Sequence, residues 1–102
     1  MKIIWSPRAR ITFLNILNYL NKEWGKNSVQ NFISEVTDIL MNVSINPEMF
    51  ISAKKNKYIR KGIISKHISL YYRIKPRKNE IELLTFWDNR QDPRKLVLSG
   101  KP

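Results

Sequence analysis

Residues 68–87, with the sequence ISLYYRIKPRKNEIELLTFW, contain two strand patterns joined by a turn. In the first pattern, apolar side chains at every second position from Ile68 to Ile74 alternate with more polar ones, which is typical of a strand with one buried face. Residues 76–79 have the composition of a turn. Residues 80–87 are apolar on both faces in their second half, which predicts a central strand covered on both sides. We expect the two strands to pair antiparallel.

Two further segments have strand composition. Residues 58–65 form a weaker strand pattern, in which Gly62 is expected to mark a β-bulge. Near the N-terminus, residues 3–5 form a short apolar run that suits a first strand. These segments predict one N-terminal strand and three or four antiparallel strands in the second half of the chain.

Two amphipathic helices are predicted between these strands, because apolar side chains recur at spacings of three and four. The first stripe is Phe13, Ile16, Leu17, Leu20 and Trp24, and the second is Val29, Phe32, Ile33, Val36, Leu40 and Val43. Ser6-Pro7 favours the start of the first helix and Gly25 its end. Ser28 is the expected cap of the second helix, and Asn46-Pro47 its end. Since the connection is short, we expect an antiparallel hairpin whose stripes share one core.

The order of these elements predicts the α+β class, with a short N-terminal strand, an antiparallel helical hairpin and a curved antiparallel sheet of three or four strands. With 102 residues, 42% hydrophobic and 26% charged, the chain has the size and composition of one globular domain, which we assign to residues 1–102. It has no cysteine, which excludes a disulfide scaffold and a cysteine nucleophile. No apolar run approaches the roughly 18 residues that cross a bilayer, and the N-terminus has no signal-peptide core, so we expect a cytoplasmic protein without a membrane partner.

The charge of the chain is large and unevenly distributed. There are 19 basic and 8 acidic side chains, for a net charge of +11. Residues 1–50 carry almost balanced charges, whereas the segment from Lys54 to Lys78 contains basic side chains and no acidic one. A field of this kind attracts polyanions, so we expect RNA, DNA or an acidic protein segment as a partner. The alternative is a basic face that is merely solvated.

A basic cluster on the loop that enters the second-half strands is the first candidate binding site. It contains an aromatic ring among its cations, and its members are Lys54, Lys55, Lys57, Tyr58, Arg60 and Lys61. Cations interleaved with an aromatic ring suit contact with phosphates and bases, and would equally hold acidic side chains of a protein. Arg73, on the outward face of its strand, and Arg90, at the end of the last strand, are expected to extend this surface.

Other residues that could carry catalysis or binding are more simply explained by surface or structural roles. His67 is the single histidine and could act as a general base, but it has no second histidine as a partner. Asp88 and Asp92 alternate with Arg90 and Arg94, which favours salt-bridged turn residues over a metal site, so we expect no metal. Trp5 and Trp24 are expected to pack in the core, and Trp87, which ends the central strand, is the one tryptophan kept as a possible surface contact.

Four segments resemble the RelE/ParE superfamily of toxins from type II toxin–antitoxin modules: IIWSPRA (3–9), YLNKEWGKNSVQNF (19–32), ISLYYRI (68–74) and FWDNRQDPRKL (86–96). The resemblance covers nearly the whole chain, and the tract DNRQDP is most similar to the ParE-like branch. It implies a small basic toxin that is neutralised by an acidic antitoxin. RelE-like members cut mRNA at the ribosome, and ParE-like members poison DNA gyrase.

The resemblance also implies candidate catalytic residues. Cleavage by attack of the ribose 2′-OH requires a base, an acid and cations at the phosphate, with no metal or cofactor. In RelE-like members these roles belong to basic residues on the middle strands, an arginine near the last strand and a C-terminal tyrosine. Arg60 and Arg90 match two of these positions, while a second strand position falls on Gly62 beside Lys61. A further position that is arginine in RelE-like members is occupied by Ser69, and no tyrosine follows Tyr72. Half of the RelE-like catalytic residues are therefore missing.

The sequence therefore favours a toxin that binds DNA gyrase and is silenced by a cognate acidic antitoxin. The alternative is an mRNA endonuclease, acting at the ribosome or on free mRNA, whose candidate catalytic residues are Arg60, Lys61, Arg90 and His67. A third possibility is a degenerate member that binds an antitoxin without being toxic. Because Arg60, Lys61 and Arg90 lie off the apolar stripes, we expect their replacement by alanine to leave the fold intact.

Overall fold

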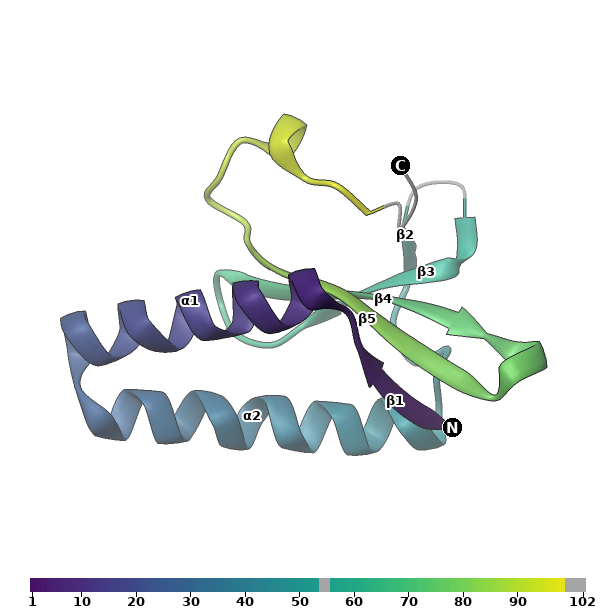
Figure 1. Ribbon diagram of the computed structural model, residues 1–102, viewed down its shortest axis with the longest axis horizontal. Coiled ribbons are helices and arrows are strands. Elements are labelled where there is room, and N and C mark those ends of the chain that lie inside the picture. The colour runs from purple at the N-terminus through teal and green to yellow at the C-terminus, as the bar shows by residue number, and fades with distance from the viewer. Residues whose placement is uncertain (54–55, 99–102) are drawn as a thin grey trace.

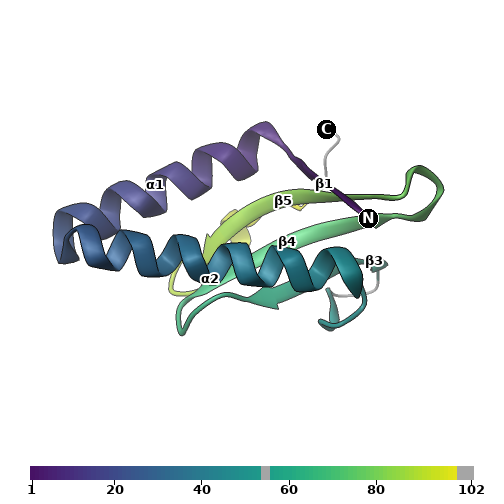
Figure 2. The ribbon, with the colours of Figure 1, turned by 90° about the horizontal axis from the view of Figure 1, so that it is seen from below.

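In the computed structural model, which describes residues 1–53 and 56–98, a curved five-stranded sheet is covered on one face by two antiparallel helices (Figures 1 and 2). The elements follow one another as β1 (Lys2–Trp5), α1 (Pro7–Trp24), α2 (Lys26–Ile45), β2 (Ser52–Ala53), β3 (Asn56–Ile63), β4 (Ile68–Lys75) and β5 (Glu80–Asp88). Short 3₁₀ turns at Pro76–Lys78 and Pro93–Lys95 follow β4 and β5.

The sheet has the strand order β1-β5-β4-β3-β2. Strands β2 to β5 pair antiparallel with their neighbours, whereas β1 joins the edge of β5 in parallel. The α+β class, the N-terminal strand, the helical hairpin and the antiparallel second half are thus confirmed. The parallel β1 makes the sheet a mixed one, in which β5 is an interior strand between β1 and β4, in agreement with its apolar sequence. No helix in the described part of the chain is both long and apolar enough to span a bilayer.

The helix boundaries follow local signals. The Ser6 side chain accepts a hydrogen bond from the Ala9 amide at 3.0 Å, and Pro7 occupies the first helical position. Gly25 has φ +87°, a backbone conformation that few other residues adopt, and Asn46 ends α2. The expected cap at Ser28 is wrong. Because Gly25 both ends α1 and precedes the first residue of α2, Ser28 already lies within the first turn of that helix.

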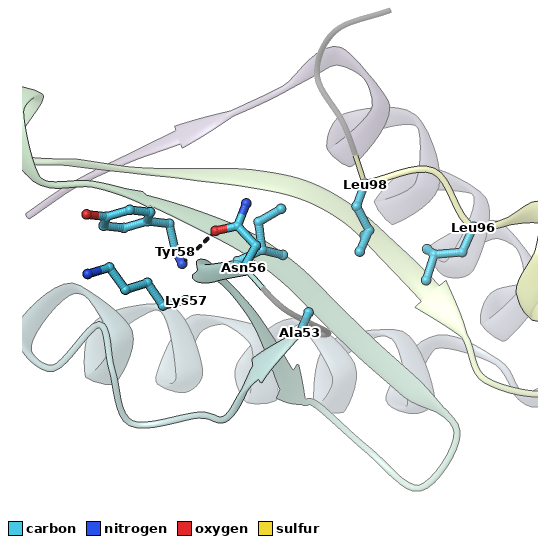
Figure 3. A pocket seen from close by; sticks show the side chains of 7 residues that line it. Ala53, Asn56, Lys57, Tyr58, Leu96 and Leu98 are labelled. Carbon is cyan, nitrogen blue, oxygen red and sulfur yellow. Dashed lines mark hydrogen bonds between the residues drawn. The ribbon is translucent and has the colours of Figure 1, made fainter.

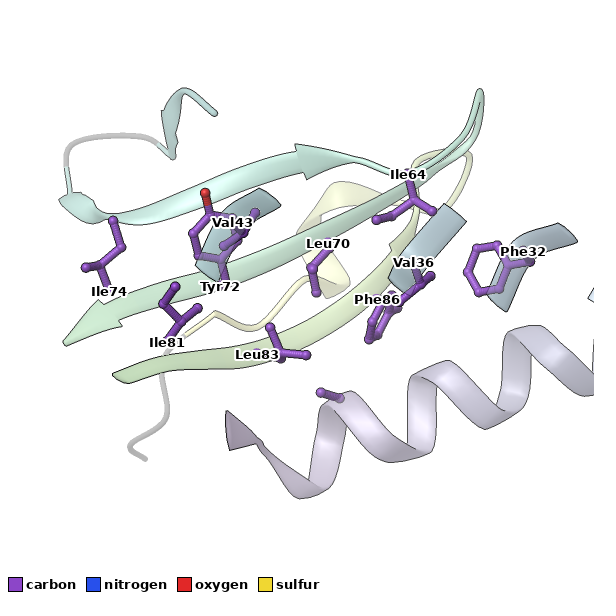
Figure 4. Close-up of a cluster of buried hydrophobic side chains, with 11 residues drawn as sticks. Phe32, Val36, Val43, Ile64, Leu70, Tyr72, Ile74, Ile81, Leu83 and Phe86 are labelled. Carbon is purple, nitrogen blue, oxygen red and sulfur yellow. The ribbon is translucent and has the colours of Figure 1, made fainter. Parts of the chain in front are cut away.

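The main core lies between the helices and the sheet (Figure 4). Its buried residues are Ala9, Phe32, Val36, Val43, Ile64, Leu70, Tyr72, Ile74, Ile81, Leu83 and Phe86. Trp5 packs against this core, as expected, but the packing predicted for Trp24 is wrong, since 73% of its surface is exposed. The hairpin extends past the end of the sheet (Figure 1), so the last turn of α1 has no strand beneath it. Ile33 is likewise 40% exposed, although it continues the predicted stripe of α2.

The other face of the sheet is also covered. Ser69 and Tyr71, expected on a polar face, are both buried. A second, smaller cluster of Ile59, Tyr71 and Leu84 lies on this face, and Leu96 and Leu98 from the C-terminal segment pack against it. The strand β4 therefore has two buried faces, because the C-terminal segment returns over the sheet, as Figure 1 shows.

A β-bulge distributes the side chains of β5 between the two faces. Tyr71 pairs with Thr85 and Tyr72 with Leu83, so Leu84 is the extra residue. The bulge expected at Gly62 is wrong, because Gly62 pairs regularly with Leu70. A glycine is required there for a different reason: a Cβ atom at position 62 would lie 3.0 Å from the Phe50 ring.

Ser6, the N-cap of α1, and Thr12 within α1 complete the hydrogen bonding of β5 where β1 ends. The Ser6 amide donates to the Leu83 carbonyl at 3.2 Å, and its hydroxyl donates to the Leu84 carbonyl at 3.2 Å. Six residues later, the Thr12 hydroxyl accepts a hydrogen bond from the Phe86 amide at 2.9 Å and donates to the Arg8 carbonyl at 2.8 Å. These bonds satisfy backbone groups of a buried strand edge and fix α1 against the sheet.

We predict that Thr12→Val lowers the free energy of unfolding by about 1–3 kcal/mol, since the shape is kept while the Phe86 amide loses its acceptor. Thr37→Val is the matched control, because the exposed Thr37 hydroxyl bonds only to Ile33 within its own helix. Urea denaturation of both variants measures the difference. Equal losses in the two variants would show that the bond to β5 contributes nothing.

Candidate functional site

The candidate residues found in the sequence occupy three separate places in the fold. Lys61, Arg73 and Trp87 lie on the sheet face that is turned away from the helices, which we call the outer face. Arg60 lies on the opposite side of β3, towards the helices. His67 and Arg90 meet beyond the end of β5. Lys54 and Lys55 lie outside the described residues.

The outer face combines cations with aromatic rings. The Lys61 ammonium lies 5.9 Å from the centroid of the Tyr71 ring, and Trp87 packs beside Tyr71 in the small outer cluster. Arg73 stands between Ile59 and Glu82 in the strand pairing, and its Nε atom is buried with no hydrogen-bond partner among the described residues.

A hollow of about 700 Å³ adjoins the outer cluster (Figure 3). It lies between β3 and the C-terminal segment, and it is lined by Ala53, Asn56, Lys57, Tyr58, Ile59, Leu96 and Leu98. The Lys57 ammonium lies 5.2 Å from the centroid of the neighbouring Tyr58 ring. The predicted combination of Lys57 and Tyr58 is thus placed beside an apolar hollow, where a partner can contact both charge and apolar surface.

Arg60 makes structural contacts. Its Nη1 atom donates to the Phe50 carbonyl at 2.9 Å, and its Nε atom donates to the Lys57 carbonyl at 3.0 Å. Next to it, the Tyr72 hydroxyl donates to the Pro47 carbonyl at 2.6 Å, and burial raises the pKa of Tyr72 to about 12 although the nearby Arg60 charge opposes this shift. Both side chains hold the segment between α2 and β3 against the sheet.

These contacts bear on the expectation that replacing Arg60 by alanine leaves the fold intact. We predict that Arg60→Ala lowers the free energy of unfolding by about 1.5–3 kcal/mol, because two carbonyls lose a charged donor. Lys61→Ala, one residue further along the same strand, is expected to change it by less than about 0.5 kcal/mol. Thermal and urea unfolding of the two variants give the comparison. If Arg60→Ala is as stable as Lys61→Ala, the two hydrogen bonds are not stabilising.

A cleft of about 560 Å³ brings His67 and Arg90 together. It lies between α1, the loop from β3 to β4 and the residues that follow β5. Besides these two side chains, its lining includes Tyr19, Asp88 and an apolar floor. The Arg90 guanidinium donates to both oxygens of Asp88, at 3.0 and 2.7 Å. This ion pair lowers the pKa of Asp88 and raises the pKa of Arg90. The Tyr19 phenol also contributes to the raised pKa of Arg90.

Tyr19 is the residue of this cleft that the sequence analysis did not find. It lies on α1 beside the apolar stripe that includes Ile16 and Leu20, and 49% of its surface is exposed. The sequence signal for Tyr19 is an aromatic side chain just outside the apolar stripe of an amphipathic helix, since such a side chain does not pack in the core. The cleft therefore holds an imidazole, a phenol and a guanidinium, which are hydrogen-bonding groups, and the guanidinium is already paired with Asp88.

The Asp-rich tract after β5 has the turn geometry expected for it. The Asp92 side chain accepts from the Arg94 amide at 3.0 Å and forms an ion pair with its guanidinium at 2.8 Å, which lowers the pKa of Asp92. In residues 1–53 and 56–98, no three histidine or carboxylate side chains come together in a group that could hold a metal ion.

Solved structures of known proteins share this fold. A chain of the chromosomal ParDE TA system from P. aeruginosa aligns with a TM-score of 0.69 and 13% identity, over 86% of this chain and 95% of that one. The YoeB/ParE toxin from Agrobacterium tumefaciens aligns with a TM-score of 0.62 and 12% identity, over 86% and 98% of the two chains. A YoeB–YefM toxin–antitoxin complex from Staphylococcus aureus contains a chain that aligns with a TM-score of 0.56 and 15% identity, over 83% and 92%.

These likenesses show that the chain has the fold of the ParE and YoeB toxins. They confirm the RelE/ParE-like fold implied by the sequence resemblance. No protein-family model matches the sequence. No curated protein matches it significantly either.

Proposed function

We propose that this protein is the toxin of a type II toxin–antitoxin module, a growth inhibitor that a cognate acidic antitoxin neutralises. The observation that carries the proposal is the alignment of the chain with nearly the full length of proteins that are described as ParE or YoeB toxins. The net charge of +11 and the cations of the outer face support an acidic partner.

We further propose DNA gyrase as the target, in place of mRNA. An endonuclease of the RelE type would require its cations around one phosphate. Here Arg60 bonds to two backbone carbonyls on the helix side of β3, Lys61 points to the other side, and Arg90 is paired with Asp88 beyond β5. This dispersal supports a toxin that acts by binding, as does the similarity of the tract DNRQDP to the ParE-like branch.

The target can be identified by pulse labelling after the protein is induced without an antitoxin. We expect incorporation of labelled thymidine to fall within minutes, before incorporation of labelled amino acids. Purified DNA gyrase should then accumulate cleaved DNA when the protein is added. An earlier fall in protein synthesis would instead support the mRNA endonuclease, and unchanged growth would indicate a degenerate member of the module.

The outer face provides a separate test of the antitoxin surface. We predict that the double variant Lys57→Glu/Lys61→Glu binds a polyglutamate peptide about tenfold more weakly at low salt, since two cations beside the outer cluster are reversed. The loss should shrink as the salt concentration rises. Lys22→Glu/Lys26→Glu is the control, because it changes the net charge equally but lies at the tip of the helical hairpin. Equal losses in both double variants would assign the binding to net charge alone.

A further inference from the structure

The overhang of the helical hairpin creates a second surface that differs from the outer face. Beneath the last turns of α1, the cleft of about 560 Å³ adjoins another hollow of about 420 Å³. The two share Leu20, Trp24, Phe32 and Ser65, so they form one continuous depression, which we call the overhang cleft. At this place the helical hairpin extends past the end of the sheet (Figure 1).

The lining of the overhang cleft has the composition of a protein-binding site. Its floor is apolar and consists of Ile16, Leu20, Phe32 and Ile68. Trp24, 73% exposed, and Tyr19, 49% exposed, stand at its rim with Arg90. Tryptophan, tyrosine and arginine are the side chains that most often dominate the energy of protein interfaces. An exposed aromatic surface that adjoins an apolar cleft is typical of a protein interaction site.

The charge of the overhang cleft distinguishes its partner from a polyanion. Among the lining residues, the charged ones are Glu35, Asp88 and Arg90, and the last two are paired with each other at 2.7 Å. The adjacent segment of α1, residues 11–21, contains no charged side chain, although the chain as a whole carries +11. A phosphate backbone or an acidic segment gains little here. The amides of Asn15, Asn31 and Gln91 instead offer hydrogen bonds to a peptide backbone.

We propose that the overhang cleft binds an uncharged segment of the target protein, with an apolar or aromatic side chain of that protein inserted beside Trp24. The acidic antitoxin binds elsewhere, through the cations of the outer face. This inference rests on the proposed toxin function and adds the surface by which the toxin engages its target. It also implies that target binding depends weakly on salt, in contrast to antitoxin binding.

The test compares Trp24→Ala with Leu14→Ala. Leu14 is the control because it is 55% exposed on the same helix and lines neither hollow. We expect Trp24→Ala to bind purified DNA gyrase about 30-fold more weakly, at both low and high salt, and to lose growth inhibition. Leu14→Ala should match the wild type in both measurements. Polyglutamate binding should be unchanged in both variants, since neither alters the outer face.

Several outcomes would overturn the proposal. Growth inhibition by Trp24→Ala equal to that of the wild type would overturn it. So would a loss of polyglutamate binding by Trp24→Ala as large as its loss of gyrase binding, because this would place the acidic partner in the cleft. A second variant, Tyr19→Ala, gives the same test from the other rim if Trp24→Ala has a lowered melting temperature. If the wild type inhibits growth but does not bind gyrase, the choice of gyrase is wrong, and growth inhibition by the variants still decides the role of the cleft.

Discussion

The hydrogen bonding of β5 on both edges is the constraint on which the rest of the structure depends. On one edge it pairs with β4 along its length, and on the other it pairs with β1, which has only four residues. Beyond β1, the N-cap residue Ser6 and Thr12 of α1 provide the partners for Leu83, Leu84 and Phe86. Because these bonds fix the start of α1 over β5, the remaining turns of the helix must project past the sheet. The exposed Trp24 and the overhang cleft are consequences of that direction.

The bulge at Leu84 determines how the same strand serves two cores. A regular strand alternates its faces strictly, so Leu83 and Phe86 would point in opposite directions. The extra residue shifts the alternation, and both side chains reach the main core while Leu84 joins Ile59 and Tyr71 on the outer face. The C-terminal segment then covers that face with Leu96 and Leu98. The outer cations therefore surround an apolar cluster that is already packed.

The features that the sequence predicted are those that local chemistry determines. Ser6, Gly25 and Asn46 mark helix ends through their own backbone and side-chain preferences, and periodicity identified both helices and the strands β4 and β5. The cap assigned to Ser28 is a local error, because Gly25 already precedes the first residue of α2, whereas the other errors depend on distant parts of the chain. Whether Trp24 is buried depends on where the sheet ends, and whether Arg60 or Lys61 faces outward depends on the register of β3, whose sequence has no clear alternation. The cleft that joins Tyr19 to His67 and Arg90 requires the tertiary fold.

The separation of charge along the chain becomes a separation of surfaces in the fold. The nearly neutral first half forms the hairpin and the basic second half forms most of the sheet, so the overhang cleft, which the hairpin covers, has few charged side chains, whereas the outer face of the sheet is cationic. If the protein is a toxin, as we propose, and its target binds in the cleft, an antitoxin confined to the outer face leaves that cleft open. Neutralisation by direct exclusion then requires the antitoxin to extend past the tract Asp88–Arg94, where the outer face and the cleft meet. An antitoxin that does not reach this tract must act through a change in the fold.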